Sequence, residues 1–196
     1  MISDRERIQT EMTAQETPQT LTDHEGSLLS LVHRLQPITA YKVAKFYQDS
    51  PVASVNKSMG QVYPMISRFS KDGLVEGHQI EDDARGTEVW RTTDKGEIAL
   101  KTWLQEFKPL QLIPHDTLGT KVLSFGLLSH QERLDWVLKA KAELEKKQAE
   151  LDAYHQKSDE PFQSFAHDNA VSILRARMDW LDRVLFDLVK SSAASS

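Results

Sequence analysis

The chain contains no cysteine, and this absence excludes disulfide bonds, cysteine nucleophiles and thiolate metal sites. Long hydrophobic runs are also missing, since no segment approaches the roughly 20 consecutive apolar residues that a membrane-spanning helix needs. Residues 1–8 lack the apolar core of a signal peptide. We therefore expect a cytoplasmic protein without a membrane partner.

A surplus of positive charge is missing as well. The net charge is −5, and residues 37–101 carry nine basic and nine acidic side chains. A nucleic-acid surface would therefore have to come from local clustering of cations. No glycine-rich phosphate loop or serine–histidine–acid order is present, and no pair among the seven histidines has metal-ligand spacing with an acidic third ligand. We expect no enzymatic activity, no cofactor and no metal.

What the sequence does contain, after a polar arm at residues 1–20, is a series of short helical patterns. Thr22 and Glu25 have capping-box spacing, which predicts the start of a helix. Pro37 disfavours helical geometry at the residue before it and ends that helix. A second helix is expected over residues 39–49.

A third helix is predicted over residues 58–71 from its apolar spacing. Its inner face is formed by Met59, Val62, Ile66 and Phe69. Pro64 is unusual inside this pattern because proline has no amide hydrogen to donate. It fits best if the helix starts late, with Pro64 in the first turn. Gly73 is expected to end the helix as a left-handed cap.

Two strands and a further helix follow. Residues 74–80 and 87–92 read as strands joined by a tight, polar connection. The next helix should open at Thr93 or Asp94, with Glu97 at capping-box spacing from Asp94, and run to about residue 107. The order helix–strand–strand–helix is typical of the second half of a winged helix-turn-helix.

The C-terminal part of the chain is predicted to be helical and to form a dimer. Ser129 and Glu132 form the clearest capping box and start a long helix to about residue 155, and a last helix covers about residues 165–189. The apolar seams on these helices are wider than packing within one chain needs, so a second copy is expected to cover part of them. The expected dimerisation residues are Leu134, Val137, Leu144, Leu151, Ile173, Trp180, Leu181, Leu185 and Leu188.

The expected fold class is mostly α with a small β-wing: an N-terminal winged helix-turn-helix and a C-terminal helical dimerisation domain. We expect a disordered arm at residues 1–20, the winged-helix domain at 21–108, the dimerisation domain at 116–190 and a flexible tail at 191–196.

The stretches Q-V-Y-P-M-I-S-R-F-S-K-D-G-L-V and G-T-E-V-W-R-T-T-D-K-G-E-I-A-L-K-T-W-L carry a recognisable pattern. The matching positions are Tyr63, Pro64, Gly73, Leu74, Gly86, Thr93, Gly96, Trp103 and Leu104. With these residues the sequence resembles the PadR-like family of bacterial transcriptional regulators over about residues 22–190. The sequence departs from the family pattern at the second strand, where Glu88 stands in place of an expected basic residue.

The resemblance implies a dimeric regulator whose third helix enters the major groove of double-stranded DNA, and it favours repression over activation. For some members it also implies a small effector, which here would be aromatic or phenolic. The operator should be partly palindromic. A rival interpretation, a winged-helix protein-interaction module without DNA binding, is favoured by Glu88 and by the neutral charge of the domain.

The candidate DNA-binding residues combine cations with hydroxyl and amide groups that suit phosphate oxygens and base edges. Arg68 is the candidate for a guanine edge, whereas Tyr63 fits a DNA contact and a core position equally well. The full set is Lys57, Ser58, Gln61, Tyr63, Pro64, Arg68, Lys71, Arg85 and Arg91.

Overall fold

The computed structural model describes residues 19–51, 59–80, 86–113, 116–157 and 160–193. The chain divides into two compact units. The first extends to Lys108, and the second comprises Pro109–Ser196 together with Ser50–Ser54.

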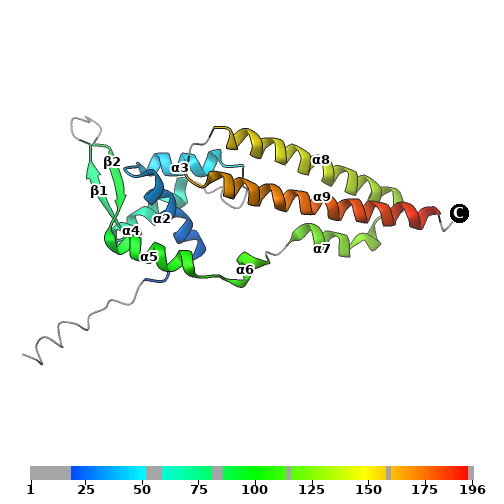
Figure 1. Cartoon of the computed structure of the whole chain (residues 1–196), viewed down its shortest axis with the longest axis horizontal. Coiled ribbons are helices and arrows are strands. Elements are labelled where there is room, and N and C mark those ends of the chain that lie inside the picture. The colour runs from blue at the N-terminus through cyan, green and yellow to red at the C-terminus, as the bar shows by residue number, and fades with distance from the viewer. Residues whose placement is uncertain (1–18, 52–58, 81–85, 114–115, 158–159, 194–196) are drawn as a thin grey trace, which may run out of the picture. The chain divides into compact units, whose positions relative to one another are not determined.

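The first unit contains four helices and a two-stranded antiparallel sheet within its described residues (Figure 1). In chain order these elements are α2 (Asp23–Leu35), α3 (Ala40–Asp49), α4 (Met59–Lys71), β1 (Val75–Gln79), β2 (Glu88–Thr92) and α5 (Asp94–Gln105). The order confirms the predicted winged-helix pattern.

The first helix begins at the cap that the sequence predicts, and the second also follows a threonine. Thr22 is the N-cap of α2: its Oγ1 accepts from the Glu25 amide at 3.3 Å, and Glu25 Oε2 accepts from the Thr22 amide at 2.8 Å. The capping box is therefore confirmed. Thr39 Oγ1 accepts from the Lys42 amide at 3.2 Å at the start of α3.

Pro64 is the sixth residue of α4, so the predicted late start of this helix is wrong. Pro64 cannot donate to the carbonyl of Gly60, four residues earlier. The helix tolerates the loss because Pro64 lies on its exposed face, where water can reach that carbonyl. The opposite face is fully buried and consists of Val62, Ile66 and Phe69.

The end of α4 is set by Gly73, whose φ of +72° is in the left-handed region. The Leu74 amide donates to the Phe69 carbonyl at 2.8 Å, and the Gly73 amide donates to the Ser70 carbonyl at 3.1 Å. This pattern of bonds confirms the predicted glycine cap and turns the chain directly into β1.

The sheet has one partner that the sequence analysis missed. β1 and β2 pair with Val75 opposite Thr92. Ile38 adds an isolated antiparallel bridge to Trp90, with N–H···O distances of 3.2 and 2.8 Å. The Gln36 side chain accepts from the Thr92 amide at 2.7 Å. The segment between α2 and α3 is thereby fixed along the outer edge of β2.

The start of α5 corrects one detail of the prediction. Its N-cap is Thr93, whose Oγ1 accepts from the Gly96 amide at 3.1 Å. The alternative capping box from Asp94 to Glu97 is wrong, because Asp94 is already the first helical residue. The helix ends at Gln105, about half a turn earlier than predicted.

The core of the first unit is apolar and draws on every helix and on β1. Burying one such side chain contributes about 1.5–3 kcal/mol. Its largest fully buried members are Leu28, Leu29, Leu31, Val32, Val43, Val62, Ile66, Phe69 and Leu74. This core holds α4 with one face inward and leaves its other face open.

The second unit is helical. Its elements are α6 (Pro109–Leu112), α7 (Thr117–Leu123), the short 3₁₀ helix η2 (Phe125–Leu127), α8 (His130–His155) and α9 (Gln163–Ala193). Ser129 and Glu132 form the predicted capping box at the start of α8. The stretch between the two predicted domains contains one helical turn, α6. No helix in the described residues is long and apolar enough to cross a membrane.

The helices α8 and α9 pack against each other along the predicted seam. Val137 and Leu181 are fully buried there, and Leu144 and Leu151 are at most 9% exposed. These four residues were predicted to contact a second copy, and their burial corrects that assignment: they hold α8 against α9 within one chain. The other predicted dimerisation residues keep accessible surface; they are Leu134, Ile173, Trp180, Leu185 and Leu188.

Candidate nucleic-acid interface

The exposed face of α4 is polar and lies opposite the buried Val62 stripe. Tyr63 is 47% exposed, which identifies it as a surface residue and not a core residue. Met65 is half-buried and packs against the core. The remaining exposed positions of this face are Gln61, Pro64, Ser67, Arg68 and Lys71.

A groove of about 780 Å³ runs between the start of α3, the exposed face of α4 and the strand β2. We call it the helix–wing groove. Most of its surface is apolar and includes Pro64, Ile66 and Trp90, whereas its polar groups are mainly hydroxyls, with one cation, Lys71, and one anion, Glu88. The hydroxyl-bearing residues are Thr39, Tyr41, Tyr63, Ser67, Ser70 and Thr87. These hydroxyl groups can donate hydrogen bonds to phosphate oxygens, although the groove itself carries little net charge.

Arg68 lies on the part of the exposed α4 face that is turned away from the helix–wing groove and toward α2. Its Nη2 donates to Glu25 Oε1, and the two side chains form an ion pair. Burial raises the pKa of Glu25, but the hydrogen bonds from Thr22 and the charge of Arg68 outweigh that effect and lower it overall. The carboxylate is therefore ionised at neutral pH.

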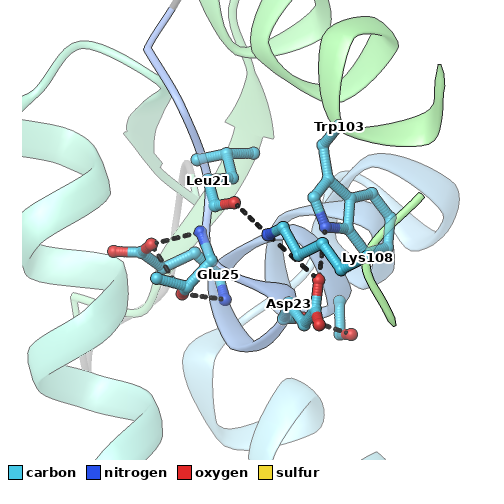
Figure 2. Close-up of polar contacts among 7 residues, drawn as sticks. Leu21, Asp23, Glu25, Trp103 and Lys108 are labelled. Atoms are coloured by element: carbon cyan, nitrogen blue, oxygen red, sulfur yellow. Dashed lines mark hydrogen bonds and ion pairs between the residues drawn. The ribbon is translucent and has the colours of Figure 1, made fainter. Parts of the chain in front are cut away.

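The beginning of α2 is fastened to α5 and to the segment after it (Figure 2). The Trp103 indole N–H points to Asp23 Oδ1 at 3.4 Å. Lys108 Nζ donates to the same oxygen at 3.3 Å and to the Leu21 carbonyl at 3.2 Å. These contacts fix the helix end that carries Glu25, and through Glu25 they fix the surroundings of Arg68.

Of the predicted wing contacts, the structure describes only Arg91. Glu88 and Trp90 line the helix–wing groove, and side chains alternate along a strand, so Arg91 lies on the opposite face of β2. In register it stands opposite Glu76. The predicted contacts Lys57, Ser58 and Arg85 lie outside the described residues.

Two contributors to this surface were missed. The sequence predicts Glu25 only as a helix cap, because its contact with Arg68 joins positions 43 residues apart. Ser67 lines the groove and faces away from the apolar stripe of α4. Its position on the polar side of the predicted helix is the sequence signal that marks it as a surface residue.

The second unit has a smaller groove of about 490 Å³ on α9, next to α6 and α7. Trp180 and Ile173 give it an apolar wall, and Arg177 pairs there with Asp116 at 3.4 Å. Trp136 lies outside this groove and packs edge-on against Phe125, with ring centroids 5.1 Å apart. In the described part of the chain, no group of three or more histidine or acidic side chains is arranged to hold a metal ion.

The first unit is thus a winged helix, and it is followed in the chain by a pair of long helices. Residues 28–102 match the family model described as the transcriptional regulator PadR-like family. The match lies within the winged-helix part of the chain and agrees with the resemblance seen in the sequence. No curated protein matches the chain.

Solved structures show the same fold. The chain is similar to Bacillus subtilis PadR in complex with operator DNA, with a TM-score of 0.73 and 17% identity over 87% of this chain and 99% of that chain. It is also similar to Bacillus subtilis PadR in complex with p-coumaric acid, with a TM-score of 0.67 and 16% identity over 86% and 98%. The chain is similar as well to a PadR-like transcriptional regulator from Bacillus cereus, with a TM-score of 0.66 and 14% identity over 86% of this chain and 99% of that chain.

Proposed function

We propose that the protein is a homodimeric transcriptional repressor that binds a partly palindromic operator through α4. The observation that carries the proposal is the exposed polar face of α4, bordered by the hydroxyl-rich helix–wing groove. Bacillus subtilis PadR, which shares the fold, has been solved in complex with operator DNA.

In this proposal α4 lies in the major groove, and one DNA strand follows the helix–wing groove. Arg68 reads a guanine edge, and Gln61 and Tyr63 contact bases or phosphates at the start of the helix. Lys71 and the hydroxyl groups of the groove hold the sugar–phosphate backbone. The Glu88 carboxylate repels phosphate, so the DNA strand would have to keep its phosphates away from the β2 side of the helix–wing groove.

The second unit supplies the dimer contact. Its helices leave large apolar side chains at the surface, among them Leu138, Ile173, Phe186 and Val189. Together with Leu134, Trp180, Leu185 and Leu188, they would be covered by the same helices of a second copy. Two copies would place two α4 helices in successive major grooves, about 34 Å apart.

We further propose that an aromatic or phenolic acid controls the protein. The Bacillus subtilis PadR complex with p-coumaric acid supports this class of effector. The groove on α9 would offer the Trp180 ring at the edge of the proposed dimer contact, and Arg177, which pairs there with Asp116, would offer a cation for the effector carboxylate. A set of phenolic acids would be screened by thermal shift, and an Arg177→Ala variant that still responds equally would remove this groove from the proposal.

The test begins with genome-wide recovery of bound DNA, followed by affinity measurements on the recovered operator. Arg68→Ala should weaken operator binding by about 1–3 kcal/mol, the usual value of one good base contact. Lys101→Ala, which removes an exposed cation on α5, is the matched control and should bind like wild type. If Arg68→Ala binds as tightly as wild type, Arg68 does not contact the operator.

The rival function, a protein-interaction module, is favoured by Glu88 in the helix–wing groove and by the absence of net positive charge over residues 37–101. It predicts that no DNA is recovered and that no promoter fragment shifts at low ionic strength, with or without phenolic acids. That result would replace the proposal above.

A further inference from the structure

We propose that Glu25 is a positioning residue for sequence recognition: it holds the Arg68 guanidinium in a fixed orientation on α4. The inference rests on the proposed function, since it concerns how Arg68 reads DNA. It assigns to a helix-capping carboxylate a second role that its place in the capping box does not require.

The geometry of the Glu25 carboxylate divides its two oxygens between two tasks. Oε2 accepts from the Thr22 amide at 2.8 Å and from Thr22 Oγ1 at 2.7 Å, which completes the capping box. Oε1 accepts from Arg68 Nη2. The α2 cap therefore fixes the carboxylate first, and the fixed carboxylate then orients the arginine.

The exposures of the two side chains fit this division. The Glu25 side chain is 17% exposed, whereas the Arg68 side chain is 53% exposed. The anion is thus held inside the surface, and the cation on it remains open to a ligand. A pair exposed on both sides would be screened by solvent and would restrain little.

The chemistry of arginine allows both contacts at once. The guanidinium carries five N–H donors in a planar fork, and the contact with Glu25 uses one terminal nitrogen. The donors that remain can bind a guanine edge through O6 and N7. An arginine restrained before binding loses less rotamer freedom when it meets its base, so Glu25 should raise affinity for the operator more than for other DNA.

The capping box provides a matched variant. Glutamine at this position also closes a capping box after threonine, so Glu25→Gln keeps the helix cap and removes the charge. Its melting temperature should stay close to wild type, which separates a positioning effect from a folding defect. Arg68→Ala and the double variant complete a double-mutant cycle.

The experiment measures the affinities of all four full-length proteins for the recovered operator and for a shuffled duplex of the same composition, at one salt concentration. Glu25→Gln should lower the operator-to-shuffled affinity ratio about tenfold, as expected for one charge-assisted hydrogen bond. The double variant should match Arg68→Ala, because without Arg68 the carboxylate has nothing to orient.

Three results would overturn the inference. Glu25→Gln could tighten binding to both duplexes, which would make Glu25 a competitor of phosphate for Arg68. It could leave the ratio unchanged. It could also lower the ratio equally in the Arg68→Ala background, which would place its effect elsewhere. Failure of the wild-type protein to bind any DNA is a separate outcome, because it removes the proposed function itself.

Discussion

Gly26 allows α5 to lie close against α2, and replacing it with alanine tests the packing that supports the interface. A Cβ at Gly26 would lie 2.2 Å from Trp103 Cε2, 2.3 Å from Cδ2 and 2.6 Å from Nε1. Ordinary contacts of this kind are 3.4–4 Å, so the indole would have to move by more than an ångström. The ring is rigid, and its N–H is directed at Asp23.

Two opposing terms set the expected size of this change. Alanine has a helix propensity about 1 kcal/mol better than glycine. Forcing an extra carbon into a packed site costs about 1–3 kcal/mol. We expect the steric term to win, because the colliding atoms belong to the ring and not to the end of a flexible chain. Because three atoms of the ring collide, the steric cost should lie at the upper end of its range, and Gly26→Ala should lower the free energy of unfolding by about 2 kcal/mol.

The assay is urea denaturation of the full-length protein, followed by circular dichroism. Gly119→Ala is the matched control, since a Cβ at this α7 position meets nothing within 4 Å, and it should leave stability equal or higher. In a Trp103→Ala background the sign should reverse, and Gly26→Ala should stabilise. A Gly26→Ala protein as stable as wild type would refute the packing argument.

Two further predictions concern the cores of the two units. Burial raises the pKa of Tyr47 to about 12, despite the opposing charge of Arg34. The unfolded chain releases this proton near pH 10, so the folded protein should lose about 3 kcal/mol of stability as the pH rises from 10 toward 12. Tyr47→Phe should reduce the loss of stability that urea titrations measure between pH 9 and pH 11. An unchanged loss would contradict the assignment. Leu181→Ala should lower the free energy of unfolding of the second unit by about 2–5 kcal/mol in urea denaturation, since Leu181 is fully buried between α8 and α9; a smaller change would mean that the helices separate easily.

Features decided by neighbouring residues could be predicted from the sequence. The boxes at Thr22 and Ser129 and the cap at Gly73 depend on side chains within a few positions of each other, and all three are present. The inner face of α4 followed from spacing alone, because burial of a helix stripe repeats with the helical period.

Features decided by distant contacts could not be predicted. Ile38 pairs with Trp90 as a single bridge, and one residue leaves no periodic signal. The seams on α8 and α9 are apolar whether they face each other or a second copy, so Val137 and Leu181 could not be told apart from Ile173 by pattern. Glu25 satisfies a local rule completely, which concealed its long-range contact with Arg68.

The most direct test of the central claim is methylation protection of guanine N7 on the recovered operator. The account predicts two protected major-groove guanines about one helical turn apart, and the loss of both in Arg68→Ala. Unprotected major-groove guanines, or protection unchanged in Arg68→Ala, would contradict the placement of α4 on DNA.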